Sequence, residues 1–235
     1  METLLLGLFC IFATVGCIAV LLPYWIGAAK SRGIVGADMN KHDRRKVSEA
    51  GGITVVLAIV FGLTSLIFIK SFILRTETNL IFIFGVLATV LLAGFLGFVD
   101  DVLGWKKGIS ALQKIMLTVP IALPLVVLNV AHSTIDIPLF GIVNFGLLYP
   151  LVLVPVAIIG AANGFNLVAG YNGLEAGLGA IILGSLGIVA YFNGLNWLAL
   201  VCFIAVAALI GFLLFNFCPA RVFPGDSLTY PIGAL

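Results

Sequence analysis

Charged residues are scarce in this sequence of 235 residues. They make up 9% of the chain, whereas hydrophobic residues make up 62% and the mean hydropathy is +1.26. Soluble globular domains carry about 25% charged residues. The shortage of charge therefore excludes an ordinary soluble protein, and the formal net charge of +2 adds little about partners.

Histidine and cysteine are also rare, with two and four residues. His42 and His132 lie in different loops, and no cysteine belongs to a CxxC motif or a Cys/His ligand set. The cysteines fall within or directly after apolar runs, where they behave as small apolar residues. This argues against a zinc centre. No low-complexity linker or convincing repeat divides the chain, so we expect residues 1–235 to form a single domain.

Long apolar runs are what the sequence has in abundance. A helix of about 20 such residues spans a hydrocarbon core of roughly 30 Å and satisfies its own backbone in lipid. We therefore predict an all-α polytopic membrane protein with seven spans and an eighth beginning near Leu228. The seven predicted spans are Leu4–Ile26, Ile53–Ile69, Leu80–Val99, Ile115–Val130, Leu147–Ala161, Gly177–Phe192 and Trp197–Phe217.

The bases are distributed unequally among the loops. Of the twelve Lys and Arg residues, all but Lys70 and Arg75 follow the odd-numbered spans. Short loops rich in Lys and Arg stay cytoplasmic, so the N-terminus is predicted to lie outside. Most of the acids lie on the same side as the bases, which this rule does not explain. They are Asp38, Asp43, Glu49, Asp100, Asp101, Glu175 and Asp226.

Asp100 and Asp101 end the third predicted span, in GFLGFVDDVLGW. Two adjacent carboxylates repel each other, and at a membrane boundary this repulsion is stronger than in water. A divalent cation, or bases such as Lys106, Lys107 and Lys114, would relieve it. The plain alternative is a pair of solvated residues at the interface.

The segment NGFNLVAGYNGLEAG follows the fifth predicted span. Asn163 and Asn166 are three residues apart and would share a helix face, where their amides could coordinate a hard cation or orient a phosphate. The glycines allow turns and the close approach of a ligand. In a purely structural alternative the asparagines cap the helix and the glycines make a turn, but Glu175 is unusual in a segment so apolar.

Two further loops carry polar side chains on the same side. In NFCPARVFPGDSL, Arg221 could bind a phosphate, Phe223 could stack on a flat ring, and Asp226 offers another hard oxygen. In GADMNKHDRRKVSEAGG, residues 36–52, the bases could serve topology or attract anionic lipid. Together these loops indicate Mg²⁺ or Mn²⁺ and a phosphate-bearing substrate.

These motifs resemble those of the polyprenyl-phosphate N-acetylhexosamine-1-phosphate transferases, which form the glycosyltransferase 4 family. The resemblance covers the whole chain and depends on GxDxNK followed by SExxG, on FVDD, on NGFNLVAGYNGLEAG and on PARVFPGD. The bacterial branch typically reads DGxDG where residues 169–173 read AGYNG. That reading is similar to the eukaryotic and archaeal branch, and argues against a role in peptidoglycan synthesis.

The resemblance implies an enzyme that transfers GlcNAc-1-phosphate from UDP-GlcNAc to dolichyl phosphate, releasing UMP, the first membrane step of N-glycan assembly. It implies Mg²⁺, with Mn²⁺ as an alternative, held by Asn166 and Asp226. The residues that match catalytic positions are Asp100, Asp101 and Lys114. Those that match substrate-binding positions are Ala37, Asp38, Met39, Glu49, Asn163, Asn172, Arg221 and Phe223.

The expected partners are UDP-GlcNAc, the polyprenyl phosphate and membrane lipid, with no nucleic acid, and a homodimer is left open. The active site would face the cytoplasm of an archaeal cell membrane or of the endoplasmic reticulum. Members of the family continue through about three more spans after FPGD, so we expect the present chain to be a fragment that lacks them. The rival functions are a membrane transporter and an inactive scaffold or fragment.

Overall fold

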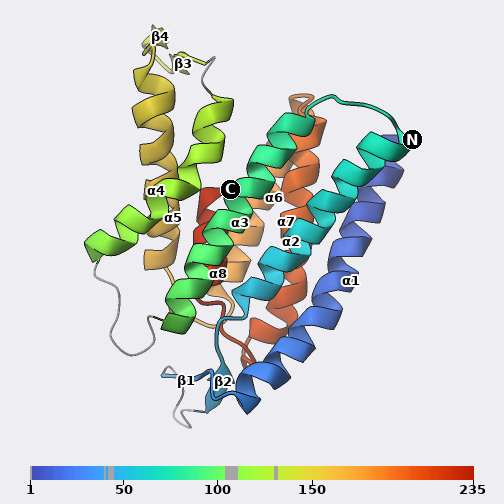
Figure 1. Cartoon of the computed structure of the whole chain (residues 1–235), viewed down its shortest axis with the longest axis vertical. Coiled ribbons are helices and arrows are strands. Elements are labelled where there is room, and N and C mark those ends of the chain that lie inside the picture. The colour runs from blue at the N-terminus through green and yellow to red at the C-terminus, as the bar shows by residue number, and fades with distance from the viewer. Residues whose placement is uncertain (1, 40, 42–44, 104–110, 130–131) are drawn as a thin grey trace.

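The computed structural model describes residues 2–39, 41, 45–103, 111–129 and 132–235 (Figure 1). Within these residues the chain forms eight α-helices and two short β-hairpins. The helices are α1 (Glu2–Ser31), α2 (Gly52–Phe68), α3 (Leu80–Leu103), α4 (Ala111–Leu128), α5 (Val154–Leu167), α6 (Leu174–Phe192), α7 (Asn196–Asn216) and α8 (Asp226–Ala234). The strands are β1 (Val35–Ala37), β2 (Lys46–Ser48), β3 (Thr134–Ile137) and β4 (Gly141–Asn144), and π-helical turns at Ile69–Ile73 and Tyr149–Leu153 adjoin α2 and α5.

Six helical stretches in this described part of the chain are long and apolar enough to cross a membrane. They comprise α1, α2, α3, α5 with its preceding turn, α6 and α7. In α4 the apolar stretch is shorter, Thr118–Leu128, and it contains Pro120 and Pro124. The expected all-α polytopic membrane protein is confirmed, and the eighth predicted helix begins at Asp226, two residues before Leu228.

The core of the bundle lies between α1, α2 and α7. Ile59 of α2 and Phe212 of α7 are completely buried there. A Cβ atom at Gly62 of α2 would collide with Thr14 of α1 and Ile204 of α7. Because helices in lipid associate through close packing rather than through exclusion of water, a glycine at this position lets three helices approach one another closely.

The short helix α8 lies inside the bundle. It packs against α2, α3 and α5, and Figure 1 shows the C-terminal end of the chain among these helices rather than at either end of the bundle. Most residues of α8 are buried. The residues after the FPGD turn, from Ser227 onward, therefore lie in the interior of the protein.

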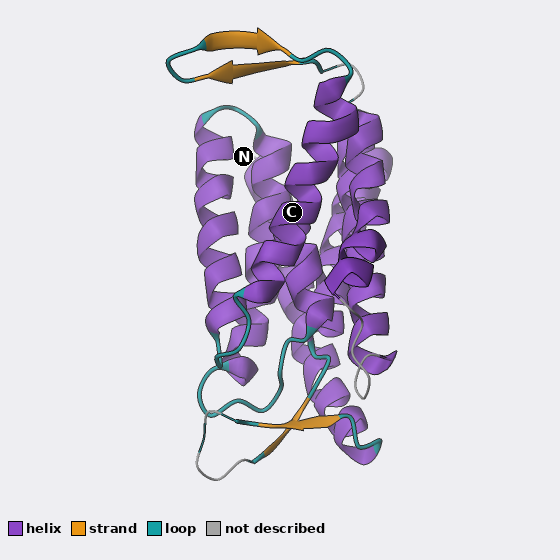
Figure 2. Ribbon diagram, turned by 90° about the vertical axis from the view of Figure 1, so that its left-hand side faces the viewer, coloured by secondary structure: helices purple, strands orange, loops and turns teal. Residues whose placement is uncertain are grey.

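The two hairpins lie at opposite ends of the bundle (Figures 1 and 2). In the first, Val35 of β1 pairs with Ser48 of β2; in the second, Thr134 of β3 pairs with Asn144 of β4. The loop between α5 and α6 and the start of α8 lie at the β1–β2 end, whereas the N-terminus lies at the other end. The sequence predicts neither hairpin, because strands of three or four residues are too short to show a clear alternation.

Candidate active site

A cavity of about 300 Å³ lies at the β1–β2 end of the bundle. Its walls come from the loop after β1, the end of α5 and the loop that follows, the end of α7, and the FPGD turn that leads into α8. The structure thus brings together elements that are far apart in the sequence. Seven of the predicted site residues line this cavity: Ala37, Asp38, Met39, Asn166, Asn172, Phe223 and Asp226.

Backbone hydrogen bonds hold the FPGD turn in place. The N–H of Phe223 donates to the carbonyl of Ser48 at 2.7 Å, and the N–H of Gly51 donates to the carbonyl of Phe223 at 2.9 Å. The N–H of Gly52 donates to the carbonyl of Pro224 at 2.8 Å. These bonds join the loop after α7 to the segment between β2 and α2, and they fix the half-buried Phe223 in the cavity wall.

Asp38 and Asn172 close the cavity from two different loops. The Asn172 amide, through Nδ2, donates to Oδ2 of Asp38 at 2.9 Å. The next residue, Gly173, donates its N–H to Oδ1 of Asn216 at 2.9 Å, and Nδ2 of Asn216 donates to the carbonyl of Val222 at 2.8 Å. The buried Asn216 amide therefore links the loop before α6 to the loop after α7.

Glu175 is a buried acid in the wall of the same cavity. Only 4% of this residue is exposed, and its Oε1 accepts a hydrogen bond from the N–H of Gly170 at 2.8 Å. Its Oε2 is buried and has no hydrogen-bond partner among the described residues. Glu175 thus braces the 169–173 loop, which carries Asn172.

Asp226 and Asn166 reach the cavity from different helices, α8 and α5. The hydroxyl of Thr229, one turn after Asp226 on α8, donates to Oδ1 of Asn166 at 3.1 Å. The Asn163 amide instead donates to Thr118 of α4 at 3.0 Å and to a carbonyl within α5. Neither asparagine side chain caps an end of α5 in these hydrogen bonds, so that part of the structural alternative is wrong. The positive φ angles of Gly170 and Gly173 agree with its other part, a turn made by the glycines.

The two acids at the end of α3 are largely withdrawn from solvent. Asp100 is 8% exposed and Asp101 is half-buried. Both oxygens of Asp101 accept backbone hydrogen bonds from the first residues of α8, Oδ1 from Asp226 at 2.6 Å and Oδ2 from Ser227 at 3.0 Å. The interpretation of the pair as solvated interface residues is therefore wrong.

Other predicted residues lie outside the cavity lining. Arg221 is exposed, and Asn163 contacts α4. The Glu49 side chain lies against Gly36, where a Cβ atom would collide with its carboxylate. Lys114 lies within α4, but its side chain is outside the described part of the structure. The structure therefore confirms a shared cavity for seven of the thirteen predicted residues and leaves the roles of all thirteen as predictions.

Four residues of the cavity with polar groups in their side chains are absent from the predicted set: Glu175, Asn216, Thr229 and Tyr171. The first two carry a signal in the sequence, because each is a polar residue at the end of an otherwise apolar span. Thr229 carries none, since a threonine within a helix often hydrogen-bonds a backbone carbonyl of that same helix. The hydroxyl of Thr229 lies 3.5 Å from the Asp226 carbonyl of its own helix, and only the packing of α8 against α5 brings it to Asn166.

Asn166 and Asp226 form the part of the cavity that could hold a cation. No group of three or more His, Cys, Asp or Glu side chains that could hold a metal is found among the described residues. Mg²⁺, however, is usually bound by one or two carboxylates together with substrate phosphates and water. One carboxylate and one amide oxygen in a cavity large enough for a diphosphate fit this pattern.

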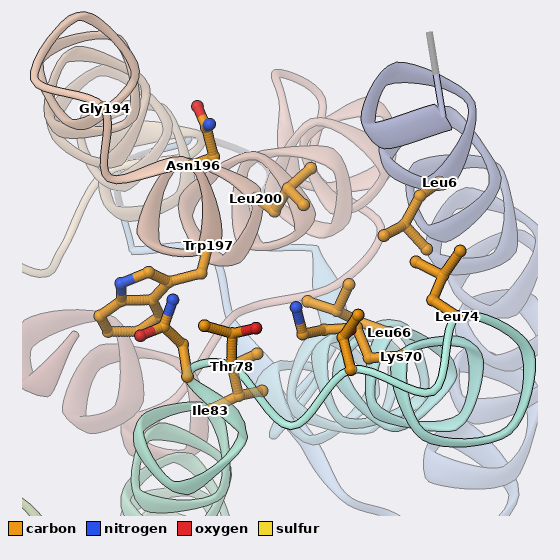
Figure 3. Close-up of a pocket in the computed structure, with 12 residues that line it drawn as sticks. Leu6, Leu66, Lys70, Leu74, Thr78, Ile83, Gly194, Asn196, Trp197 and Leu200 are labelled. Carbon is orange, nitrogen blue, oxygen red and sulfur yellow. The ribbon is translucent and has the colours of Figure 1, made fainter.

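A second cavity, of about 410 Å³, lies at the opposite end of the bundle (Figure 3). Its lining includes Leu6, Leu66, Lys70, Asn196 and Trp197. Figure 3 shows these side chains around a space bounded by α1, α2, α3 and α7. Among the described residues its lining contains no acid and no residue of the predicted site, so this cavity lacks the carboxylates of the first.

Fold and site together define a polytopic membrane protein with a polar cavity, built from acids, amides and an aromatic ring, at one end of its helix bundle. The chain belongs to glycosyl transferase family 4, whose sequence profile matches residues 83–235. The family resemblance drawn from the four motifs is thereby confirmed.

Relatives in archaea and bacteria are similar over most of this chain. It is 36% identical over 221 residues to a candidate UDP-N-acetylglucosamine–dolichyl-phosphate N-acetylglucosaminephosphotransferase of Saccharolobus solfataricus, covering 93% of this chain and 66% of that protein. A protein of the same name in Sulfolobus acidocaldarius is 35% identical over 212 residues, covering 89% and 63%. The phospho-N-acetylmuramoyl-pentapeptide-transferase of Streptococcus uberis is 33% identical over 242 residues, covering 99% and 70%. The chain thus spans just under two thirds of the length of the two archaeal relatives.

Proposed function

We propose that this protein transfers N-acetylglucosamine-1-phosphate from UDP-GlcNAc to a polyprenyl phosphate of the dolichyl type. An oxygen of the lipid phosphate attacks the β-phosphorus of the donor and forms a new P–O bond. The bond from that phosphorus to the bridging oxygen breaks, and UMP leaves with this oxygen. The names of the two archaeal relatives support this reaction. The observation that carries it is the convergence of Asn166, Asp226, Asn172 and Phe223 in one cavity.

The nucleotide end of the donor would lie against Phe223 and Asn172. A half-buried aromatic ring offers a face on which a uracil ring can stack, and an amide can donate and accept hydrogen bonds at the edge of a base. Residues Ala37–Met39 form the neighbouring wall. The bond between Asp38 and Asn172 would hold this part of the cavity in shape before the donor arrives.

The diphosphate would lie beside Asn166 and Asp226, which would hold Mg²⁺ or Mn²⁺. When bound, such a cation neutralises negative charge on the diphosphate and on the departing UMP. The protein itself contributes hard oxygen ligands from two helices that are packed against each other through Thr229. In phosphoryl transfer of this kind, positioning and electrostatic stabilisation account for most of the rate.

The acceptor phosphate would lie on the side of the site formed by α4 and α5. Asn163 joins these helices through its hydrogen bond to Thr118, and Lys114 lies one helical turn before Thr118. We assign Lys114 the role of binding the lipid phosphate and Asp100 a role beside it. The lipid phosphate is already ionised near neutral pH, so the attack does not require a strong general base.

The experiment measures transfer of labelled GlcNAc-phosphate from UDP-GlcNAc to dolichyl phosphate in proteoliposomes, together with release of UMP. We expect the two products in equal amounts and a dependence on Mg²⁺. Asp226→Ala and Asp100→Asn should each lower turnover by at least about 100-fold, the usual size of the loss when a group that stabilises the transition state is removed. If either variant kept near-normal turnover at saturating Mg²⁺, the assignment of that residue would be wrong.

The same proteoliposomes separate the enzyme from its rivals. Uptake of a labelled solute without release of UMP would favour a transporter. Binding of UDP-GlcNAc with neither transfer nor uptake would favour a scaffold. Asp136→Ala, which removes an acid of β3 at the far end of the bundle, is the matched control and should leave transfer unchanged.

A further inference from the structure

The start of α8 is capped by a side chain from another helix. The helix begins at Asp226, directly after Gly225, whose φ of 71° places it in the left-handed region. The first N–H groups of a helix have no partner within it, and glycine has no side chain to satisfy them. Asp101 of α3 supplies both acceptors, with Oδ1 2.6 Å from the Asp226 nitrogen and Oδ2 3.0 Å from the Ser227 nitrogen.

No spare space remains at this junction. Gly97 lies one turn before Asp101 on α3, and a Cβ atom there would collide with the Asp226 carbonyl group and the Ser227 nitrogen. A Cβ atom at Gly225 would collide with the Asp101 carboxylate. The glycines allow the start of α8 to approach α3 closely, and the carboxylate then fixes it there.

Helix α8 carries two side chains to the cavity wall. Asp226 is its first residue, and Thr229, one turn later, donates to Oδ1 of Asn166. The placement of both proposed cation ligands, Asp226 and Asn166, therefore depends on where α8 starts. Asp101 is not among the described residues that line the cavity, and both of its oxygens already accept hydrogen bonds from the backbone of α8.

We infer that Asp101 is a positioning residue that acts through α8, placing Asp226 directly and Asn166 by way of Thr229, without contact with the substrate. The inference rests on the proposed function, which puts a divalent cation between these two ligands. A carboxylate at a helix N-terminus is favoured by charge-assisted hydrogen bonds and by the helix dipole. Groups that orient metal ligands in this way change metal affinity by about 10- to 100-fold.

The test measures Mn²⁺ binding by electron paramagnetic resonance, with no nucleotide present, on the purified protein in lipid nanodiscs. Asp101→Ala is expected to bind Mn²⁺ about 10- to 100-fold more weakly than the wild type. Asp101→Asn keeps one acceptor oxygen and should show a smaller loss. In both variants, turnover should recover toward the wild-type value as Mn²⁺ is raised to saturation.

Two further variants sharpen the comparison. Gly97→Ala changes no acid but displaces the start of α8, so it should also weaken Mn²⁺ binding. Asp136→Ala removes an acid remote from α8 and should bind Mn²⁺ like the wild type. Melting temperatures recorded for every variant identify any that fail to fold; if Asp101→Ala is among them, Asp101→Asn decides the question.

Wild-type Mn²⁺ affinity in both Asp101 variants, with turnover still lost at saturating Mn²⁺, would overturn the inference and place Asp101 in direct contact with the substrate. A lower melting temperature with unchanged Mn²⁺ affinity would also overturn it, because the role would then be structural only. A wild-type protein that binds Mn²⁺ but releases no UMP from UDP-GlcNAc would instead overturn the proposed function. In that case weaker Mn²⁺ binding by the Asp101 variants would still support the positioning role.

Discussion

Asn172 and Asp38 lie 134 positions apart in the sequence, and their side chains are joined by a hydrogen bond of 2.9 Å. Asp38 is 2% exposed, and a buried carboxylate is costly unless it is hydrogen-bonded. The bond connects the loop after β1 to the loop between α5 and α6. It therefore couples two of the four sequence motifs at the cavity before any ligand binds.

Exchanging these two side chains tests the coupling. Asn172→Asp places two carboxylates against each other, whereas the double variant Asp38→Asn with Asn172→Asp restores one amide donor and one carboxylate acceptor. Loss of a hydrogen bond to a charged group costs about 1.5–3 kcal/mol. We therefore expect the single variant to melt roughly 3–12 °C lower in differential scanning fluorimetry and the double variant to recover most of that loss. A double variant as unstable as the single one would show that this bond does not hold the loops together.

A second prediction concerns Glu175, whose hydrogen bond from the N–H of Gly170 holds the 169–173 loop. Glu175→Gln keeps an acceptor oxygen for the N–H of Gly170, so we expect the Michaelis constant for UDP-GlcNAc to change by less than about threefold, which corresponds to under 1 kcal/mol. Glu175→Ala removes this acceptor and opens a space, at a cost of about 1–3 kcal/mol. If the loop positions Asn172, the Ala variant should raise the Michaelis constant by roughly 5- to 150-fold. Equal Michaelis constants for the Glu175→Gln and Glu175→Ala variants would show that Glu175 does not position this loop.

The parts of the site that the sequence predicts are those in which the residue type itself indicates the chemistry. Asp226 and Asn166 are hard oxygen donors at the ends of apolar spans, and Phe223 is an aromatic residue in a polar turn. Their convergence follows from topology, because alternate loops of a helix bundle lie at the same end. Arg221 shows the limit of this reasoning. Its guanidinium suits a phosphate, yet the structure leaves it exposed and outside the cavity lining.

The helix spans are predictable for a different reason. Hydropathy is a local property, so α2, α3 and α7 are found within a few residues of their observed bounds. The cap of α8 is not local, since Asp101 and Asp226 are 125 residues apart and meet only because α8 folds back into the bundle against α3. No pattern near either residue records that contact, and the motif alone does not distinguish a catalytic acid from one that positions a helix.

Gly52 provides a third prediction, on the packing of α8. A Cβ atom at this position would collide with the Leu228 backbone nitrogen and the Pro224 carbonyl oxygen. Gly52→Ala must therefore push the FPGD turn away from α2, and we expect a loss of at least about 1–3 kcal/mol in stability together with a marked fall in transfer activity. Gly16→Ala in α1 is the matched control, because no atom outside the nearby backbone of α1 itself lies within 4 Å of the new Cβ. It should be neutral or slightly stabilising, and equal losses in both variants would contradict the proposed packing.

Cys218 is a natural reporter of the side of the membrane on which the cavity lies. It is exposed and follows α7 at the cavity end, whereas Cys10 and Cys202 are buried within helices and Cys17 is half-buried in α1. If that end faces the cytoplasm, as the distribution of Lys and Arg predicts, a membrane-impermeant maleimide should label the protein in inside-out vesicles and leave it unlabelled in intact cells. Cys218→Ser should abolish the labelling.

The opposite end of the bundle supplies the complementary control. Glu77 is exposed in the turn between α2 and α3. Glu77→Cys in a Cys218→Ser background should therefore be labelled in intact cells and remain unlabelled in inside-out vesicles. The pair of reporters must give opposite patterns, because one membrane separates them. Labelling of Cys218 in intact cells would place the cavity outside, where a nucleotide-sugar donor made in the cytoplasm could not reach it, and would contradict both the orientation and the proposed reaction.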